Sequence, residues 1–83
     1  MSVGTDSGLV LYVRQGCHLC EQFLVELSVD LGPEFERLQV LDVDGDADLA
    51  VRYGLRVPVL ELDGVLVCEG FYDGAGVRRA LRV

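Results

Sequence analysis

Two cysteines separated by two residues, in the segment Cys17-His18-Leu19-Cys20, are the residues of this chain best suited to chemistry. The apolar, β-branched and aromatic run 9–13 just before them is typical of a buried strand. From Leu19 onward apolar residues recur at helical spacing, so a helix is predicted to begin at the pair. The free amides and dipole of a helix N-terminus stabilise a thiolate. We therefore expect Cys17 to be the exposed thiol of lower pKa, with Cys20 one turn away and able to close a disulfide.

The length and composition indicate one small globular domain. With 83 residues, 51% of them hydrophobic, the chain can form one packed core but not two. We expect a flexible segment over 1–8 and one domain over 9–83. Three cysteines are too few for a disulfide scaffold, and the first residues lack the features of a signal peptide. No run approaches the roughly 18 apolar residues of a membrane span, so we expect a reduced, cytoplasmic protein that binds no membrane.

The charge balance excludes one class of partner. Fourteen acidic residues stand against seven arginines and no lysine, which gives a net charge of −7. Such a chain lacks the basic face that neutralises phosphates, so no nucleic-acid partner is expected. Arg14 lies just before the cysteine pair, and Arg56 precedes Val57-Pro58. We expect these two arginines to supply positive charge to an anionic substrate or partner.

Turn and cap residues divide the rest of the chain into short elements. Gly32-Pro33 is expected to end the first helix, and Asp63-Gly64 is typical of a type I′ hairpin. This order, β-α-β-α-β-β-α, predicts an α/β fold with a four-stranded mixed sheet and helices on both faces. The expected strands are 9–13, 38–43, 57–62 and 65–69, and the expected helices run from the cysteine pair to Leu31, over 47–53 behind a cap at Asp44 or Asp46, and onward from a cap at Asp73.

Three segments resemble those of a known family: Tyr12 to Cys20, Tyr53 to Pro58, and Asp63-Gly64. Over nearly its whole length the chain resembles the glutaredoxin branch of the thioredoxin superfamily. It is most similar to the small bacterial glutaredoxin-like proteins that carry a Gly-Cys-His-Leu-Cys segment. The resemblance implies a thioredoxin-like fold, with the C-x-x-C at the first strand–helix junction.

The resemblance also implies roles for residues outside the cysteine pair. It implies that the Val57–Pro58 peptide bond is cis, that Pro58 packs against the pair, and that the backbone of Val57 receives an extended thiol substrate. It further implies contact between Arg14 and a glutathione carboxylate. Gly70 matches the start of a Gly-Gly element whose backbone amides approach glutathione.

The chain departs from glutaredoxins where glutathione would bind. His18 and Leu19 replace Pro-Tyr between the cysteines, and Arg56 replaces the threonine of Thr-Val-Pro. Phe71 replaces the second glycine of Gly-Gly, and its side chain obstructs the close backbone approach that glycine permits. A net charge of −7 also repels an anionic tripeptide. We therefore expect glutathione to bind weakly or not at all, and the substrate to be a protein disulfide.

The stock of cysteine and histidine does not favour a metal site. A structural zinc needs four ligands, which would take Cys17, His18, Cys20 and Cys68 together, although two of them are adjacent. Cys68 lies in an apolar strand and is expected to pack in the core. His18 either lowers the pKa of the neighbouring Cys17 thiol when charged or faces solvent without a role.

Acidic and aromatic residues elsewhere have structural interpretations. A calcium-binding loop beginning at Asp42 would need a glycine and a glutamate where Ala47 and Tyr53 stand. The aspartates of this segment are therefore expected to end a strand and cap a helix. Phe71 and Tyr72 are expected to pack at the start of the last helix.

Together these residues predict a glutaredoxin-like thiol–disulfide oxidoreductase. Cys17 attacks a protein disulfide or a glutathione-mixed disulfide, and Cys20 resolves the mixed disulfide that forms. The expected protein is a monomer that requires no cofactor and is re-reduced by glutathione or a thioredoxin-type reductase. The alternative is a non-enzymatic module that holds a bridged 2Fe–2S cluster or a protein partner through the C-x-x-C face. The expected substrate-binding residues are Arg14, His18, Arg56, Val57, Pro58 and Gly70.

Overall fold

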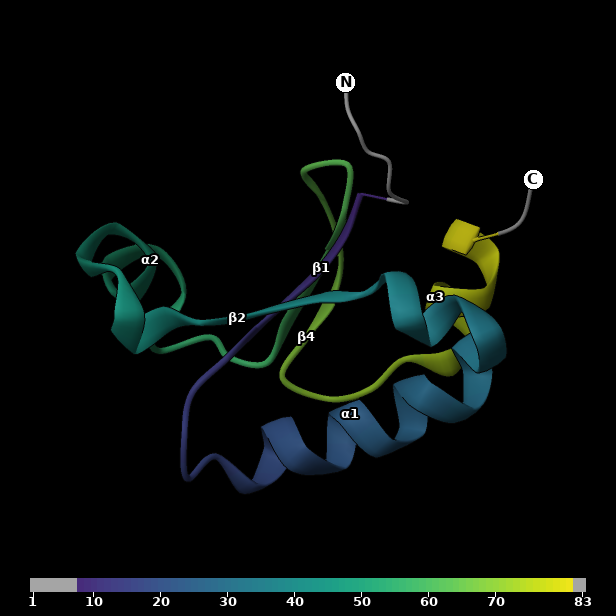
Figure 1. Ribbon diagram of the computed structural model, residues 1–83, viewed down its shortest axis with the longest axis horizontal. Coiled ribbons are helices and arrows are strands. Elements are labelled where there is room, and N and C mark those ends of the chain that lie inside the picture. The colour runs from purple at the N-terminus through teal and green to yellow at the C-terminus, as the bar shows by residue number, and fades with distance from the viewer. Residues whose placement is uncertain (1–7, 82–83) are drawn as a thin grey trace.

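The computed structural model describes residues 8–81, and its elements follow the predicted order (Figure 1). Of the predicted flexible segment 1–8, residues 1–7 lie outside the described part, and the carbonyl of Gly8 accepts the N–H of Asp63 at 2.9 Å. None of the helices within 8–81 is long and apolar enough to cross a membrane. The strands are β1 (Leu9–Val13), β2 (Gln39–Asp42), β3 (Val59–Leu62) and β4 (Val65–Glu69). The helices are α1 (His18–Leu31), α2 (Ala47–Tyr53) and α3 (Gly74–Leu81), and two short 3₁₀ segments are η1 (Gly32–Arg37) and η2 (Val43–Gly45).

The strands form the predicted four-stranded mixed sheet, in the order β2-β1-β3-β4. β1 lies between a parallel β2 and an antiparallel β3, and β4 pairs antiparallel with β3. The β3–β4 turn is the predicted type I′ hairpin, because both central residues have positive φ, 52° at Asp63 and 83° at Gly64. The crossover from β1 to β2 through α1 places the start of α1 just beyond the carboxyl end of β1. Sites of α/β proteins commonly lie at this edge of the sheet.

Successive strand residues point to opposite faces of the sheet, and helices cover both faces, as predicted. Leu11 and Leu60 belong to a core beneath α1 and α3, whereas their neighbours Tyr12 and Val59 belong to a core beneath α2. Figure 1 shows α1 beside α3, with α2 apart from both. The larger core consists of Leu9, Leu11, Phe23, Leu27, Leu31, Leu60, Cys68 and Val77, and the smaller core of Val43, Tyr53 and Val59.

Helix α1 begins at the cysteine pair and ends at Gly32, as predicted. Cys17 is its N-cap, and the Cys17 Sγ accepts a hydrogen bond from the backbone N–H of Cys20 at 3.1 Å. Gly32 ends the helix with a φ of 57°, a conformation that glycine adopts without steric cost. The buried stripe of the helix consists of Cys20, Phe23, Leu27 and Leu31.

The second and third strands are shorter than predicted. The strand expected from Val57 begins at Val59, because the Val57 N–H donates to the Tyr53 carbonyl at 3.0 Å and Pro58 has no N–H. β2 begins at Gln39 instead of Leu38, and η2 takes its expected last residue, Val43. The segment η1, which was not predicted, follows the helix stop at Gly32. Segments of 3₁₀ helix this short contain too few residues to show a hydrophobic period, so the pattern does not reveal them.

Candidate active site

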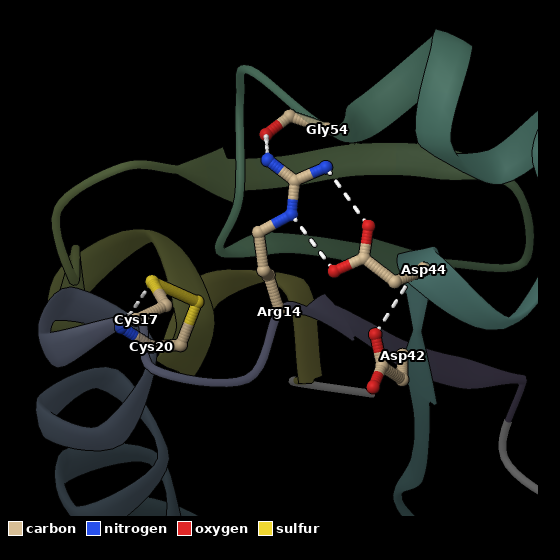
Figure 2. A network of polar contacts seen from close by, with 6 residues as sticks. All are labelled: Arg14, Cys17, Cys20, Asp42, Asp44 and Gly54. Atoms are coloured by element: carbon tan, nitrogen blue, oxygen red, sulfur yellow. Dashed lines mark hydrogen bonds and ion pairs between the residues drawn. A yellow bond between two sulfur atoms is a disulfide. The ribbon is translucent and has the colours of Figure 1, made fainter.

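The cysteine pair lies at the first turn of α1 and is closed as a disulfide (Figure 2). The two Cα atoms are 5.2 Å apart, within the roughly 4.4–6.8 Å that a disulfide requires. Cys17 is half-buried at the helix cap, whereas Cys20 is only 3% exposed. Of the two cysteines, Cys17 is therefore the more accessible from solvent. The helix start that donates the Cys20 N–H to this sulfur also favours its thiolate form once the pair is reduced.

His18 is the first residue of α1 and projects into solvent. Its side chain is 87% exposed, and its Nδ1 lies 3.9 Å from Glu21 Oε1. Solvent at this exposure screens any charge on the imidazole. The geometry therefore gives His18 a carboxylate partner on the helix surface.

Arg14 joins three segments around the cysteine pair, as Figure 2 shows. Its Nε and Nη2 donate to the two carboxylate oxygens of Asp44 at 3.0 and 3.1 Å, and its Nη1 donates to the Gly54 carbonyl at 3.0 Å. The Arg14 carbonyl in turn accepts the N–H of Cys17 at 3.3 Å. The loop that leads into α1 is thereby tied to η2 and to the end of α2.

The backbone register explains why Arg14 meets Asp44. Val13 pairs with Asp42 in the parallel β1–β2 ladder, so both strands leave the sheet at the same edge. Asp42 accepts the N–H of Asp44 at 2.9 Å, which fixes the turn into η2. Asp46 caps α2 by accepting the N–H of Asp48 at 2.8 Å. The acidic segment thus ends a strand and caps a helix, as predicted.

The α2–β3 loop, residues 54–58, contains the predicted cis peptide bond between Val57 and Pro58. Pro58 is fully buried, and its carbonyl accepts the N–H of Gly70 at 2.8 Å. Gly70 has a φ of 79°, which favours glycine at this position. The loop before β3 and the segment after β4 are therefore joined by a backbone hydrogen bond. Packing of Pro58 against the cysteine pair remains a prediction.

Arg56 also binds a carboxylate of this chain. Its Nε and Nη2 donate to Glu69 Oε1 at 3.1 and 2.6 Å, and its Nη1 donates to the Arg52 carbonyl at 3.3 Å. The hydrogen bonds that Arg56 donates to Glu69 raise the pKa of Arg56 above its ordinary value. Arg56 precedes Val57, and Glu69 precedes Gly70, so this pair lies beside the Gly70–Pro58 hydrogen bond.

Sequence reasoning missed both carboxylates, because each arginine meets an acid from a distant segment. Arg14 and Asp44 are 30 residues apart, and Arg56 and Glu69 are 13 apart. The sequence signal that could have identified these carboxylates is their position relative to the strand ends. An acid two residues beyond a strand, or at the last position of one, can reach an arginine that leaves the sheet at the same edge.

The two aromatic residues before α3 behave differently from each other. Tyr72 packs edge-to-face on Phe23 with ring centroids 5.1 Å apart, and its hydroxyl donates to Asp30 at 2.6 Å. Burial, together with this hydrogen bond, raises the pKa of Tyr72 above its ordinary value. Phe71 is 76% exposed, so the prediction that it packs at the helix start is wrong. The chain turns at Gly70, directing Tyr72 inward and leaving Phe71 at the surface beside the candidate site.

Cys68 is a free cysteine in the larger core, as predicted. Burial raises the pKa of its thiol above the ordinary value. Its neighbours are apolar residues beneath α1 and α3. Among residues 8–81, no three His, Cys, Asp or Glu side chains gather as a potential metal site.

The fold and the cysteine pair define a thioredoxin-like domain with C-x-x-C spacing. The family model described as "Glutaredoxin-like domain (DUF836)" matches residues 8–82. This chain belongs to that glutaredoxin-like family. Comparison with curated proteins gave no significant match.

Solved structures agree with this assignment. Protein Ne2328 from Nitrosomonas europaea is 33% identical, with a TM-score of 0.76 over 99% of this chain and 100% of that one. Protein XcR50 from X. campestris is 34% identical, with a TM-score of 0.69 over 88% of this chain and 93% of that one. Fasciola hepatica thioredoxin shares the fold at 21% identity and a TM-score of 0.51, over 92% of this chain and 80% of that one.

Proposed function

We propose that this protein is a thiol–disulfide oxidoreductase that acts on protein disulfides. The observation that carries the proposal is the unequal exposure of the cysteine pair. Cys17 is accessible at the helix cap, and Cys20 lies buried one turn behind it at disulfide distance. A pair arranged in this way presents one sulfur to a substrate and keeps the second for the resolving step.

The exchange proceeds in two displacements at sulfur. The Cys17 thiolate attacks one sulfur of the substrate disulfide, which forms a mixed disulfide and releases the other sulfur as a thiolate. The Cys20 thiolate then attacks the Cys17 sulfur and releases the second substrate thiolate. Two electrons pass to the substrate, and the Cys17–Cys20 disulfide remains. An external dithiol reductant, such as a thioredoxin-type reductase, restores the reduced pair and supplies the two electrons.

Three features support a protein substrate over a small one. The α2–β3 loop carries the cis Val57–Pro58 bond, and because the Val57 N–H already donates to the Tyr53 carbonyl, the proposal assigns the Val57 carbonyl to an extended chain. Phe71 and Leu55, which are 76% and 100% exposed, add apolar surface near that loop. Arg14 and Arg56 already bind carboxylates of this chain, which weakens their role toward an anionic tripeptide. The proposal includes a monomer that works in the cytoplasm, where thiols stay reduced.

A disulfide-reduction assay tests the proposal, with insulin as substrate and dithiothreitol as electron donor. Wild type is expected to accelerate insulin reduction, and Cys17→Ser to abolish the acceleration. The matched control is Cys68→Ser, which replaces the buried thiol outside the pair. Per mole of folded protein, this variant should be as active as wild type. Acceleration by Cys17→Ser equal to wild type, or none by wild type, would contradict the proposed function.

A further inference from the structure

Carboxylates of the chain itself neutralise both arginines that flank the candidate site. Asp44 binds Arg14 through two parallel hydrogen bonds, and Glu69 binds Nε and Nη2 of Arg56. The third nitrogen of each guanidinium donates to a backbone carbonyl. Every guanidinium nitrogen of these two residues therefore already has an acceptor within the protein.

Both ion pairs involve the same short segment, the α2–β3 loop of residues 54–58. Arg14 donates to the carbonyl at the start of this loop, and Arg56 is part of it. The other end of the loop receives the backbone hydrogen bond from Gly70, which follows Glu69. Cys17 lies three residues after Arg14 and donates its N–H to the Arg14 carbonyl. The two carboxylates thus occupy the positive groups nearest to the segments that would receive a substrate.

We propose that Asp44 and Glu69 are specificity residues that exclude carboxylate-bearing small thiols and disulfides from the Cys17 site. A ligand carboxylate would need the same guanidinium fork that Asp44 or Glu69 already fills. The internal carboxylate is tethered, so its effective concentration at the arginine exceeds that of a free ligand. Once displaced, it would lie unpaired beside the negative charge of the ligand.

This inference deepens the proposed function and rests on it for the meaning of the selectivity. A segment of a protein substrate that carries no carboxylate binds backbone and apolar surface without competing for either arginine. Stabilisation of the fold is a weaker explanation, because the four side chains are between 37% and 51% exposed and such pairs contribute little to folding. Selectivity is the consequence that these contacts have at the site.

A titration with S-methylglutathione, followed by amide chemical shifts, tests the inference. This probe carries two carboxylates and has no free thiol, so binding is measured without turnover. The test variant combines Asp44→Asn with Glu69→Gln and frees both arginines. The control combines Glu26→Gln with Glu36→Gln, which removes the same charge at exposed positions elsewhere.

Wild type and control are expected to show no saturable shifts, whereas the test variant binds at low millimolar concentration. The expected gain is about tenfold or more, with shifts centred on Val57 and Gly70. Saturable binding by wild type as tight as by the test variant, or an equal gain in the control, would overturn the inference. If the double variant is not folded by circular dichroism, each single substitution is expected to give part of the gain. A failed insulin assay would refute the proposed function and leave this binding result readable.

Discussion

At the scale of single residues, the three cysteines occupy three different environments. Cys17 caps a helix and is half-buried, Cys20 is 3% exposed, and Cys68 is 9% exposed in an apolar core. Reactivity of a thiol follows its accessibility and its fraction of thiolate. The helix start favours the thiolate of Cys17, whereas burial raises the pKa of Cys68.

Alkylation should therefore distinguish the cysteines in the reduced protein. Iodoacetamide at neutral pH is expected to modify Cys17 well before Cys20 and Cys68. Mass spectrometry of peptides quenched at successive times measures the three rates. Reduced protein unfolded in urea provides the control, because the three thiols should then react at similar rates. Faster labelling of Cys68 than of Cys17 in the folded protein would contradict this account.

Tyr53 gives a prediction on pH. Burial, then the hydrogen bond to Glu61, raises the pKa of Tyr53 from 10.0 to about 12. The unfolded chain releases the Tyr53 proton near pH 10, whereas the native protein keeps it to about pH 12. The contribution of this hydroxyl to the free energy of unfolding is therefore fully present below pH 10 and is lost between pH 10 and about pH 12. Tyr53→Phe is expected to cost about 0.5–1.5 kcal/mol at neutral pH, since it removes the hydrogen bond.

The difference between wild type and Tyr53→Phe should shrink as the pH rises, because the variant has no proton to lose. Urea unfolding at neutral pH and at about pH 11 measures both free energies. A difference that stays constant or grows with pH would show that the Tyr53 hydroxyl does not titrate as described.

At the scale of elements, α2 depends on its cap. Asp46 accepts the N–H groups of Asp48 and Leu49 at 2.8 and 3.3 Å. Asp46→Ala is expected to lower the free energy of unfolding by about 0.5–2 kcal/mol, because these helix amides lose their acceptor. Urea unfolding measures the loss. The control Asp48→Ala removes a carboxylate from the same turn and should cost less, so an equal loss would refute the capping role.

Gly54 joins α2 to the α2–β3 loop, and its carbonyl accepts a hydrogen bond from Arg14. A Cβ at this position would collide with the Ala50 carbonyl and approach Arg14 Nη2 to 2.9 Å. Gly54→Ala is therefore expected to destabilise the protein by about 1–3 kcal/mol. The control Gly45→Ala places its Cβ in open space and should cost much less. Equal unfolding free energies for the two variants in urea would contradict the packing described for Arg14 and the loop.

The elements also separate what the sequence could predict from what it could not. The α1 cap at Cys17, the stop at Gly32 and the Asp63-Gly64 hairpin follow local rules and were predicted. The exposure of Phe71 depends on how the chain turns at Gly70, which no local pattern specifies.

In the candidate site too, features set by contiguous residues were predicted and features set by distant residues were not. The cysteine pair and the cis Val57–Pro58 bond were predicted from contiguous segments. The partners of Arg14 and Arg56 could not be, because they depend on where β2 and β4 end in space. Long-range ion pairs are set by sheet register, and a single sequence carries no direct record of register.

At the scale of the whole molecule, the fold leaves Cys17 partly exposed at the start of α1 and pairs both Arg14 and Arg56 with carboxylates. The larger core holds α1 against the sheet and so fixes the position of the cysteine pair at the edge of the sheet. The chain carries a net charge of −7, and the two arginines nearest the site are paired. The proposed preference for protein disulfides over small anionic ones rests on these features together.

The most direct measurement is capture of the mixed disulfide. Reduced Cys20→Ser protein is mixed with oxidised insulin, and the linked species is isolated without reductant and mapped by mass spectrometry. The account predicts one mixed disulfide, joining Cys17 to an insulin cysteine, which dithiothreitol releases. A variant that also carries Cys17→Ser should form none. Linkage through Cys68, or equal linkage without Cys17, would contradict the claim that Cys17 is the attacking thiol.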